Sequence, residues 1–374
     1  MNAPVYLDYN ATAPLYPEVV ERMSVVMSAP LNASAVHARG REGRKIIEAA
    51  RRNVSALVGA DPENVIFNSG ATEGNNTVLR HFNGRVLVSA IEHPSVLQVR
   101  PDAEIIPVKP SGVIDLLALE EALQKEPKAA LVSLMLANNE TGIIQPAKEV
   151  AGLAMRYGAW MHCDAVQAAG KIPVDMTALG IHFMTLSAHK IGGPQGVGAL
   201  VLGQCGETPM LLAGGGQEKK ARAGTENVAG VAGFGLAAEM ALKNLADNQL
   251  KQANLRDGME RRLCDLYPDI AIHGAAETRL PNTSLFSLPG LKAETLLMAL
   301  DLAGVCVSNG SACTSGKVEA SHVLKAMNVP QAEIVSALRV SLGYGTDSGD
   351  IETFLAALKR SVPVDKIQSS SSGG

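Results

Sequence analysis

Residues 160–193 read WMHCDAVQAAGKIPVDMTALGIHFMTLSAHKIGG and place a carboxylate and a lysine at the ends of two successive predicted strands. The first apolar run, 159–162, leads to Asp164, and the second, 182–186, leads to Lys190. Short apolar runs of this kind are typical of buried strands. In open α/β sheets the carboxyl ends of the strands form the edge where ligands bind, so we expect both side chains at that edge.

A carboxylate and a lysine amine placed in this way suit one chemistry in particular. Lysine amines form Schiff bases with carbonyl compounds, including pyridoxal 5'-phosphate (PLP). An Asp anion beside the pyridinium nitrogen keeps the PLP ring protonated, so that the ring withdraws electrons from the substrate. Taken singly, Asp164 would more often be an ordinary buried residue at a strand end and Lys190 an ordinary surface lysine, and the hypothesis therefore depends on the rest of the chain.

The composition excludes several classes of protein. The 374 residues are 47% hydrophobic, enough for a large core and for two or three domains. The formal net charge of -4 gives no reason to expect direct contact with nucleic acid or an anionic membrane. No basic stretch followed by an apolar one marks the N-terminus as a signal peptide, and no apolar run reaches the roughly 18 residues of a membrane span. We therefore expect a cytoplasmic protein.

The cysteines predict reduced thiols. Their number is odd and their spacing scattered, which argues against a disulfide framework or a metal site: Cys163, Cys205, Cys264, Cys306 and Cys313. Three of them, Cys163, Cys264 and Cys306, are interpreted as small buried hydrophobic residues. Cys313 differs, because the small and polar residues of 308–316 (SNGSACTSG) predict a loose loop and a thiol available for reaction.

Strands and helices alternate along most of the chain, which predicts a mostly parallel sheet with helices on both faces. The predicted strands of this part cover residues 64–68, 85–89, 105–107, 129–135, 159–162, 182–186 and 196–202. The predicted helices cover 17–27, 41–58, 116–124 and 148–157, then a long helix at 228–263 with a break near 244–248. Short strands at 282–288 and helices at 292–302, 332–338 and 350–360 follow.

One predicted helix begins inside the sequence SGATEGNN, residues 69–76. Free backbone amides and the helix dipole make such a terminus a site for an anion, and the hydroxyl of Thr72 would add a donor to a phosphate. Turns of this kind also begin many helices that bind nothing, so the motif alone is weak.

Nine motifs together resemble the NifS/IscS-type cysteine desulfurases, which are fold-type I PLP enzymes of the class V aminotransferase group. They occur in the family's order and cover nearly the whole chain: YLDYNATAP, SGATEGNN, EHPSV, NNETG, HCDAVQAAGK, SAHKIGGPQGVGAL, RAGTEN, SNGSACTSG and RVSLG. The resemblance implies an α/β large domain with a mostly parallel seven-stranded sheet flanked by helices, plus a smaller α+β C-terminal domain. We expect the large PLP-binding domain at 15–255, the small domain at 1–14 and 256–362, and a disordered tail at 363–374.

The resemblance also implies roles at matching positions. Lys190 would hold PLP, Asp164 would pair with the pyridinium nitrogen, and Gln167 would hydrogen-bond the phenolic oxygen. His93 would stack on the ring and move protons. The phosphate site would comprise Ala71, Thr72, Ser187, His189 and, from the other subunit of a homodimer, Thr225. The substrate site would comprise Asn139, Arg339 and Asn32. The remaining histidines are interpreted as structural: His37, His162, His182, His273 and His322.

The activity implied is the removal of sulfur from L-cysteine, which leaves L-alanine and a persulfide on Cys313. The sulfur would pass to an acceptor protein, either an iron–sulfur scaffold or a sulfur carrier, for iron–sulfur cluster assembly or tRNA thiolation. A selenocysteine lyase, another class V PLP aminotransferase and a non-catalytic sulfur-relay protein are alternatives. The sequence departs from the family pattern at 30–37 (PLNASAVH), at Ala320 and in its short end after Arg360.

Overall fold

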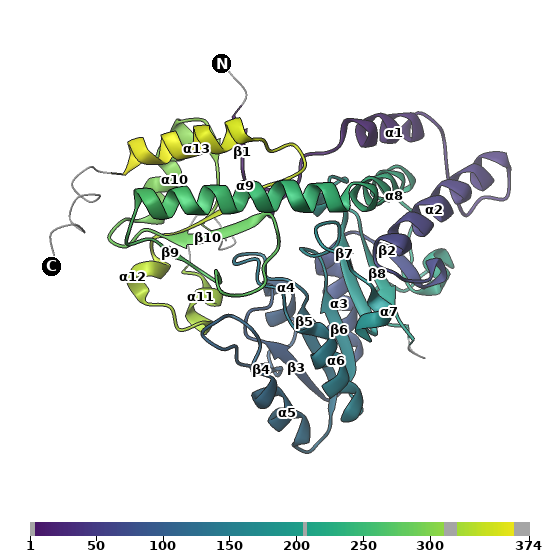
Figure 1. The fold of residues 1–374 in the computed structure, drawn as a ribbon. Helices are drawn as coiled ribbons and strands as arrows, with labels where there is room; N and C mark the ends of the chain where they lie inside the picture. The colour runs from purple at the N-terminus through teal and green to yellow at the C-terminus, as the bar shows by residue number, and fades with distance from the viewer. Residues whose placement is uncertain (1–3, 205–207, 310–319, 363–374) are drawn as a thin grey trace, which may run out of the picture.

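The computed structural model describes residues 4–204, 208–309 and 320–362 (Figure 1). A large sheet with its helices occupies one part of the molecule, and a smaller α+β part, drawn in green and yellow, occupies the other. Cys205, Cys313 and the tail expected at 363–374 lie outside the described residues.

The large sheet has seven strands in the order β2-β8-β7-β6-β5-β3-β4. Along the chain these strands are β2 (Val65–Asn68), β3 (Arg85–Ser89), β4 (Glu104–Ile106), β5 (Ala129–Met135), β6 (Trp160–Asp164), β7 (Phe183–Ser187) and β8 (Gly198–Leu202). Strand β8 runs antiparallel to both of its neighbours, and all other neighbouring pairs are parallel. The predicted mostly parallel, seven-stranded sheet is therefore confirmed.

Helices cover both faces of this sheet because its strands alternate between two hydrophobic clusters. In β3, Leu87 packs in the cluster that includes α2 and α8, whereas Val86 and Val88 pack with α3 on the other face. The helices of this part are α1 (Pro17–Met27), α2 (Ala38–Leu57), α3 (Ala71–His81), α4 (Pro94–Leu97), α5 (Leu116–Gln124), α6 (Ala147–Arg156), α7 (Met176–Leu179) and α8 (Val228–Lys243).

The smaller part has its own hydrophobic cluster, which Leu7 joins from the N-terminal segment. Its strands form the antiparallel sheet β12-β10-β9 and the parallel pair β1–β11: β1 (Val5–Tyr6), β9 (Ala271–Ile272), β10 (Thr283–Ser287), β11 (Val305–Cys306) and β12 (Ala337–Ser341). Its helices are α9 (Leu245–Leu266), α10 (Ala293–Leu302), α11 (His322–Ala326), α12 (Gln331–Ile334) and α13 (Ser348–Ser361). The boundary expected near residue 255 falls inside α9 and stays a prediction.

Two predictions about the C-terminal part are wrong. The helix predicted at 332–338 ends at Ile334, and the residues from Ala337 onward form β12, because they pair with β10 over five residues. Tertiary pairing thus overrides the local helical preference. Cys264 is exposed on α9 and Cys306 is half-buried, so of the three cysteines interpreted as buried only Cys163 is fully so.

None of the helices in the described ranges has the length and apolar character needed to cross a membrane.

Candidate active site

The two residues that began the sequence argument lie at one edge of the sheet. Asp164 is the last residue of β6, and Lys190 follows β7 after a short 3₁₀ turn, Ala188–Lys190. Because β6 and β7 are parallel neighbours, their carboxyl ends meet. His93 follows the end of β3 at the same edge. The expectation that Asp164 and Lys190 share one edge of the sheet is therefore confirmed.

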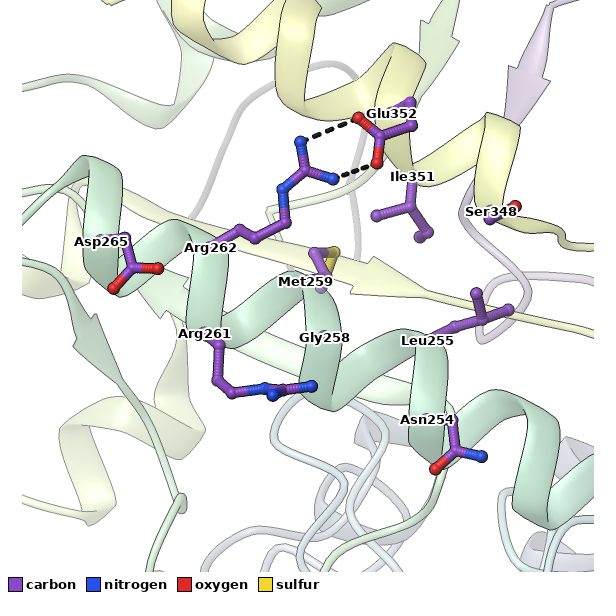
Figure 2. Close-up of a pocket in the computed structure, with 10 residues that line it drawn as sticks. All are labelled: Asn254, Leu255, Gly258, Met259, Arg261, Arg262, Asp265, Ser348, Ile351 and Glu352. Carbon is purple, nitrogen blue, oxygen red and sulfur yellow. Dashed lines mark hydrogen bonds and ion pairs between the residues drawn. The ribbon is translucent and has the colours of Figure 1, made fainter.

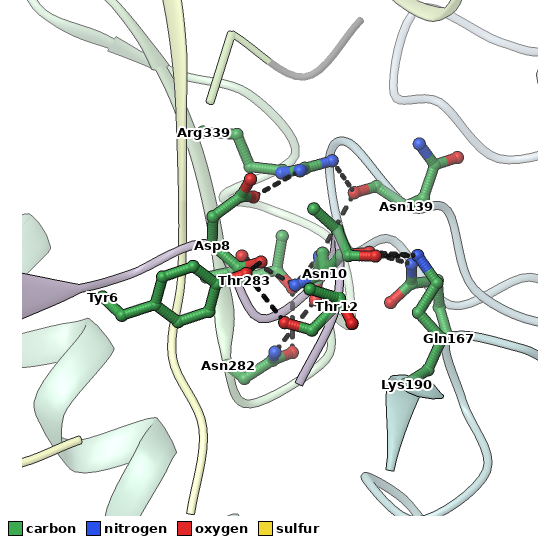
Figure 3. Close-up of polar contacts among 12 residues, drawn as sticks. Tyr6, Asp8, Asn10, Thr12, Asn139, Gln167, Lys190, Asn282, Thr283 and Arg339 are labelled. Atoms are coloured by element: carbon green, nitrogen blue, oxygen red, sulfur yellow. Dashed lines mark hydrogen bonds and ion pairs between the residues drawn. The ribbon is translucent and has the colours of Figure 1, made fainter. Parts of the chain in front are cut away.

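Lys190 points its amine at the N-terminal segment (Figure 3). Its Nζ donates hydrogen bonds to the backbone oxygens of Asn10, at 2.6 Å, and Ala11, at 2.7 Å. The pKa of Lys190 is lowered to about 8, mainly by burial and also by the charge of Arg339, while the charges of Asp8 and Asp164 act in the opposite direction. A neutral amine is the nucleophilic form, so the site activates this lysine.

Asp164 is held in one orientation by two N–H donors. Asn75 of α3 donates from Nδ2 to Oδ2 at 2.8 Å, and the backbone N–H of Val166 donates to Oδ1 at 3.0 Å. Only 7% of Asp164 is exposed.

His162 lies two residues before Asp164 in β6. Burial lowers the pKa of this ring to about 4, and the ring is hydrogen-bonded to Ser133 and Thr185, which agrees with its interpretation as a structural residue.

His93 is the N-cap of the four-residue helix α4. Its Nδ1 accepts a hydrogen bond from the backbone N–H of Ser95 at 3.1 Å and lies 2.8 Å from the Ser95 hydroxyl. Burial lowers the pKa of His93, the charge of Asp164 raises it, and Lys190 and His322 lower it. The ring is therefore neutral at pH 7.

The N-terminus of α3 carries two of the predicted phosphate contacts, Ala71 and Thr72, in its first turn. Gly70 precedes them, and no side chain caps the helix. Because the first N–H groups of a helix have no partner inside the helix, this terminus offers donors to an anion. The nearby Glu73 carboxylate is occupied by Arg222, at 3.0 Å, and by the Ser69 N–H.

The remaining phosphate candidates of the sheet edge, Ser187 and His189, lie on either side of Ala188. Ser187 is buried at the end of β7. The His189 Nδ1 lies 3.2 Å from the Thr12 hydroxyl. Burial lowers the pKa of His189 to about 4 and the charge of Lys190 acts in the same direction, so this ring is also neutral.

Arg339 reaches the same region from β12 of the smaller sheet. It donates to Asp8 Oδ1 at 2.6 Å and to the backbone oxygen of Asn139 at 3.0 Å. Its Nε is buried and has no hydrogen-bond partner among the described residues. The Asp8 partner was not foreseen from the sequence, although the motif YLDYNATAP contains it. The Arg339 guanidinium thus forms an ion pair with Asp8 and keeps one N–H, on Nε, that has no partner among the described residues.

Asn10 connects the parts of the site, and sequence reasoning did not single it out. Its side chain accepts from Lys171 at 2.8 Å and from Asn282 at 3.0 Å, and it donates to Thr283 at 2.9 Å. Its backbone oxygen accepts from Lys190 and from Gln167 Nε2. Figure 3 shows Gln167, Lys190 and Asn282 around it. Asn10 therefore joins the N-terminal segment, the large sheet and β10.

Lys171 is a second buried amine beside Lys190. Burial lowers its pKa well below the ordinary value, and Lys190 and Arg339 act in the same direction. Its Nζ donates to Gln167 Oε1 at 2.6 Å, so the amide NH₂ of Gln167 is fixed on the opposite side. One N–H of that group is bonded to Asn10 and the other remains for a ligand. The spacing of four residues between Gln167 and Lys171 was the available signal in the sequence.

Two predicted residues, Asn32 and Thr225, make no hydrogen bond to this cluster within the described residues. Asn32 and Thr225 are exposed, and the Asn32 side chain bonds only to the N–H of Ser34. Cys313 lies outside the described residues. The described residues that flank its segment do lie at the site: Ser308 exchanges backbone hydrogen bonds with Arg339, and His322 bonds to the backbone oxygen of Glu92.

A separate hollow lies between α9 and α13 (Figure 2) and contains none of the predicted site residues. An exposed Arg262–Glu352 ion pair crosses it. Within residues 4–204, 208–309 and 320–362, no cluster of His, Cys, Asp and Glu side chains has the arrangement of a metal site.

The combination of a parallel sheet, a lysine and a carboxylate at its carboxyl edge, and a buried arginine defines the class of protein. The chain belongs to the class V aminotransferase family, whose model matches residues 5–354.

Individual relatives carry more specific names. The chain is 39% identical to "Cysteine desulfurase IscS" of Dictyoglomus turgidum over 96% of this chain and 95% of that protein. Among solved structures, a NifS-like protein from Rickettsia africae superposes with a TM-score of 0.90 at 37% identity, covering 96% of this chain and 99% of that one. "SspA in complex with cysteine" superposes with a TM-score of 0.78 at 26% identity, covering 90% and 98%.

Proposed function

We propose that the protein is a PLP-dependent cysteine desulfurase. The observation that carries the proposal is the juxtaposition of Lys190, whose pKa burial lowers to about 8, with Asp164 at the ends of neighbouring strands. The family membership and the cysteine desulfurase relatives agree with it. The relative whose structure contains cysteine supports that amino acid as the substrate.

The side chains fit PLP in chemistry and in place. Lys190 would hold the cofactor covalently, Asp164 would face the ring nitrogen, and the free N–H of Gln167 would face the phenolic oxygen. The uncapped start of α3 would hold the phosphate together with Ala71, Thr72, Ser187, His189 and Thr225 of the partner subunit. PLP, when bound, supplies an electron-withdrawing ring that makes the Cα proton and the Cβ–S bond of the substrate labile.

The chain's own groups would then perform three tasks. The Arg339 guanidinium, aided by Asn139 and Asn32, would bind the substrate carboxylate, for which its planar fork is suited. Its buried Nε–H provides a donor that Asp8 does not use. The neutral amine of Lys190 would take the proton from Cα. His93, packed at the same edge, would cover the ring.

Cys313 would receive the sulfur. Its thiolate would attack the substrate sulfur, so that an S–S bond forms while the Cβ–S bond breaks and leaves its electron pair on carbon. A proton added at Cβ then completes L-alanine, and the Cys313 persulfide passes its outer sulfur to an acceptor thiol. The anchoring of the flanking residues Ser308 beside Arg339 and His322 beside Glu92 supports this role.

The Cys313→Ala variant tests this proposal. With L-cysteine and a thiol reductant, we expect wild type to form alanine and sulfide in equal amounts, and the variant to form both at least about 100-fold more slowly. The matched control is Cys264→Ala, which removes an exposed thiol on α9. Sulfide formation at the wild-type rate in Cys313→Ala would refute the hypothesis that the protein is a cysteine desulfurase acting through Cys313. Activity confined to selenocysteine would identify a selenocysteine lyase instead.

The pH dependence of cofactor uptake tests Lys190 separately. Because only the neutral amine attacks the PLP carbonyl, protonation below a pKa of about 8 should slow uptake about tenfold per pH unit, and the rate should level off above that pH. The measurement is the growth of the bound cofactor's absorbance after PLP is mixed with cofactor-free protein. A rate that continues to rise to pH 10 would contradict a lowered lysine pKa.

We further propose a cytoplasmic homodimer that delivers sulfur to an acceptor protein for iron–sulfur cluster assembly or tRNA thiolation. Three apolar side chains of α1, Val20, Val25 and Met27, are between 49% and 71% exposed in the single chain, and a partner subunit would cover them. Thr225 is also exposed, as a residue that serves the other subunit should be. Light scattering of the purified protein should give twice the chain mass, and a monomer mass would contradict this arrangement.

A further inference from the structure

A line of hydrogen bonds joins the Asp164 carboxylate to the His93 ring through Asn75 and Ser95. The Asn75 side chain is fully buried in α3. One proton of its Nδ2 goes to Asp164 Oδ2 at 2.8 Å and the other to Ser95 Oγ at 2.9 Å. An ionised carboxylate can only accept hydrogen bonds, so Asp164 fixes which end of the Asn75 amide faces it.

Ser95 passes this orientation to His93. Its hydroxyl oxygen accepts from Asn75, so its own proton is free to point at His93 Nδ1, 2.8 Å away. The Ser95 backbone N–H donates to the same ring nitrogen at 3.1 Å. Two donors therefore point at Nδ1. A proton on Nδ1 would be repelled by the hydrogen atoms of both donors.

We propose that Asn75 and Ser95 are positioning residues that hold His93 as a neutral imidazole with its proton on Nε2. The hydrogen bond made by one ring nitrogen determines which nitrogen carries the proton. The Nε2 atom has no hydrogen-bond partner in the described part of the chain, so it is the nitrogen left for a ligand.

The charges around His93 make this arrangement sensitive to Ser95. Asp164 on β6 favours a protonated ring, whereas Lys190 after β7 and His322 on α11 disfavour one. The neighbouring Glu92 carboxyl is fully buried, which raises its pKa well above the ordinary value, and it is not among the charges that shift the pKa of His93. The Ser95 hydroxyl also favours the neutral ring, because it donates to Nδ1. Without it, fewer interactions would oppose the tendency of the Asp164 charge to protonate His93.

The proposal deepens the proposed function and, as far as catalysis is concerned, rests on it. A ring whose Nδ1 is occupied and whose Nε2 carries a proton can donate a hydrogen bond but cannot accept a proton without rearranging. Lys190 would then be the base at Cα, and His93 would orient or polarise the ligand from Nε2. The protonation pattern itself needs neither cofactor nor substrate.

NMR of ¹⁵N-histidine-labelled protein without cofactor tests the pattern directly. The His93 signals are assigned by their loss in His93→Gln. We expect the chemical shifts of a neutral ring protonated on Nε2 from pH 6 to 8 in wild type. In Ser95→Ala the Nε2–H share should fall and the His93 pKa should rise by at least about 0.5 unit, because an opposing donor is lost.

Ser95→Thr is the matched control, because it keeps the hydroxyl and the backbone N–H. It should return the His93 signals to the wild-type pattern, and thermal unfolding should show that all variants are folded. In the PLP-loaded enzyme, Ser95→Ala should shift the acid limb of the kcat profile in the direction of the NMR pKa, while Ser95→Thr should not.

A His93 ring that is charged or protonated on Nδ1 at pH 7 would overturn the proposal. Identical His93 signals in wild type and Ser95→Ala would overturn the role of Ser95. If the NMR pattern is as expected but wild type forms no alanine from L-cysteine, the positioning stands and the proposed function fails, so the two failures are distinguishable.

Discussion

Replacing Lys190 with alanine is expected to lower alanine formation from L-cysteine about 10⁴-fold, the upper end of the range for loss of one proton-transfer group. The effect should be that large because one side chain would both hold the cofactor and move the Cα proton. With a pKa of about 8, Lys190 loses its proton more readily than an ordinary lysine, and its two backbone contacts aim the amine within the site.

Borohydride reduction followed by peptide mass analysis locates the attachment. Wild type should carry PLP on Lys190 and the Lys190→Ala protein should carry none. Two controls sharpen the result: Lys148→Ala removes an exposed lysine, and Lys171→Met removes the other buried amine at Asn10. Both should still be labelled on Lys190. A label on Lys171 in wild type would mean that the wrong one of two neighbouring lysines has been assigned.

The Glu218→Gln variant should lose about 3–5 kcal/mol of its free energy of unfolding, because it removes the buried charge that pairs with Arg51 and leaves that guanidinium only the half-exposed Glu48 carboxylate. The Arg51 fork bonds to both Glu218 oxygens at 2.8 and 2.9 Å, and Glu218 also accepts from the Phe67 N–H. Burial lowers the pKa of Arg51, but Glu218 and, to a lesser extent, Glu48 raise it, so that it lies above its ordinary value. The measurement is urea unfolding followed by circular dichroism.

A matched control comes from the surface of the same molecule. Arg262 and Glu352 form an equally two-pronged ion pair, but their side chains are 45% and 61% exposed (Figure 2). Glu352→Gln should change stability little, because solvent screens exposed pairs. An Arg51→Met, Glu218→Leu double variant should recover much of the loss. Equal effects of the two Glu→Gln changes would contradict the importance of burial.

The Glu218 carboxylate also helps to hold the backbone that leads to Thr225, a residue of the proposed phosphate site. Three successive residues, Glu218, Lys219 and Lys220, have left-handed backbone angles, with φ of 43°, 57° and 70°. Such conformations cost on the order of 1–3 kcal/mol each and persist only where contacts hold them. They lead into the segment with Thr225, so loss of the Arg51 contact should also weaken the phosphate site that we propose for the homodimer.

Much of the sheet edge could be predicted from the sequence because the reasoning needed only local information. Asp164 and Lys190 follow apolar runs, and the alternation of strands and helices requires parallel strands whose carboxyl ends coincide. The start of α3 was equally visible, since Gly70 and Thr72 are a local signal. Their roles toward PLP came from the resemblance to a family.

The rest depended on contacts between distant parts of the chain. Asn10 bonds to Lys171 and Asn282, which lie 161 and 272 residues away, and no local pattern announces such pairs. Arg339 lies on β12, whose first two residues, Ala337 and Leu338, were predicted to be helical, and it is the pairing with β10 that decides the structure. The Asn75–Ser95 contact has the same origin: Asn75 lies on α3, whereas Ser95 and its N-cap neighbour His93 belong to α4, and the two helices meet only in the folded chain.

The N-terminal segment has a consequence for biosynthesis. Residues 5–10 are synthesised well before their partners, because Val5 and Tyr6 pair with Val305 and Cys306, and the Asn10 N–H bonds to Ser341, 331 residues later. At typical translation rates these partners appear on the order of 20–60 s afterwards. The growing chain must therefore keep this segment unpaired, and the acceptor for the Lys190 amine can be fixed in place only when synthesis has passed residue 341.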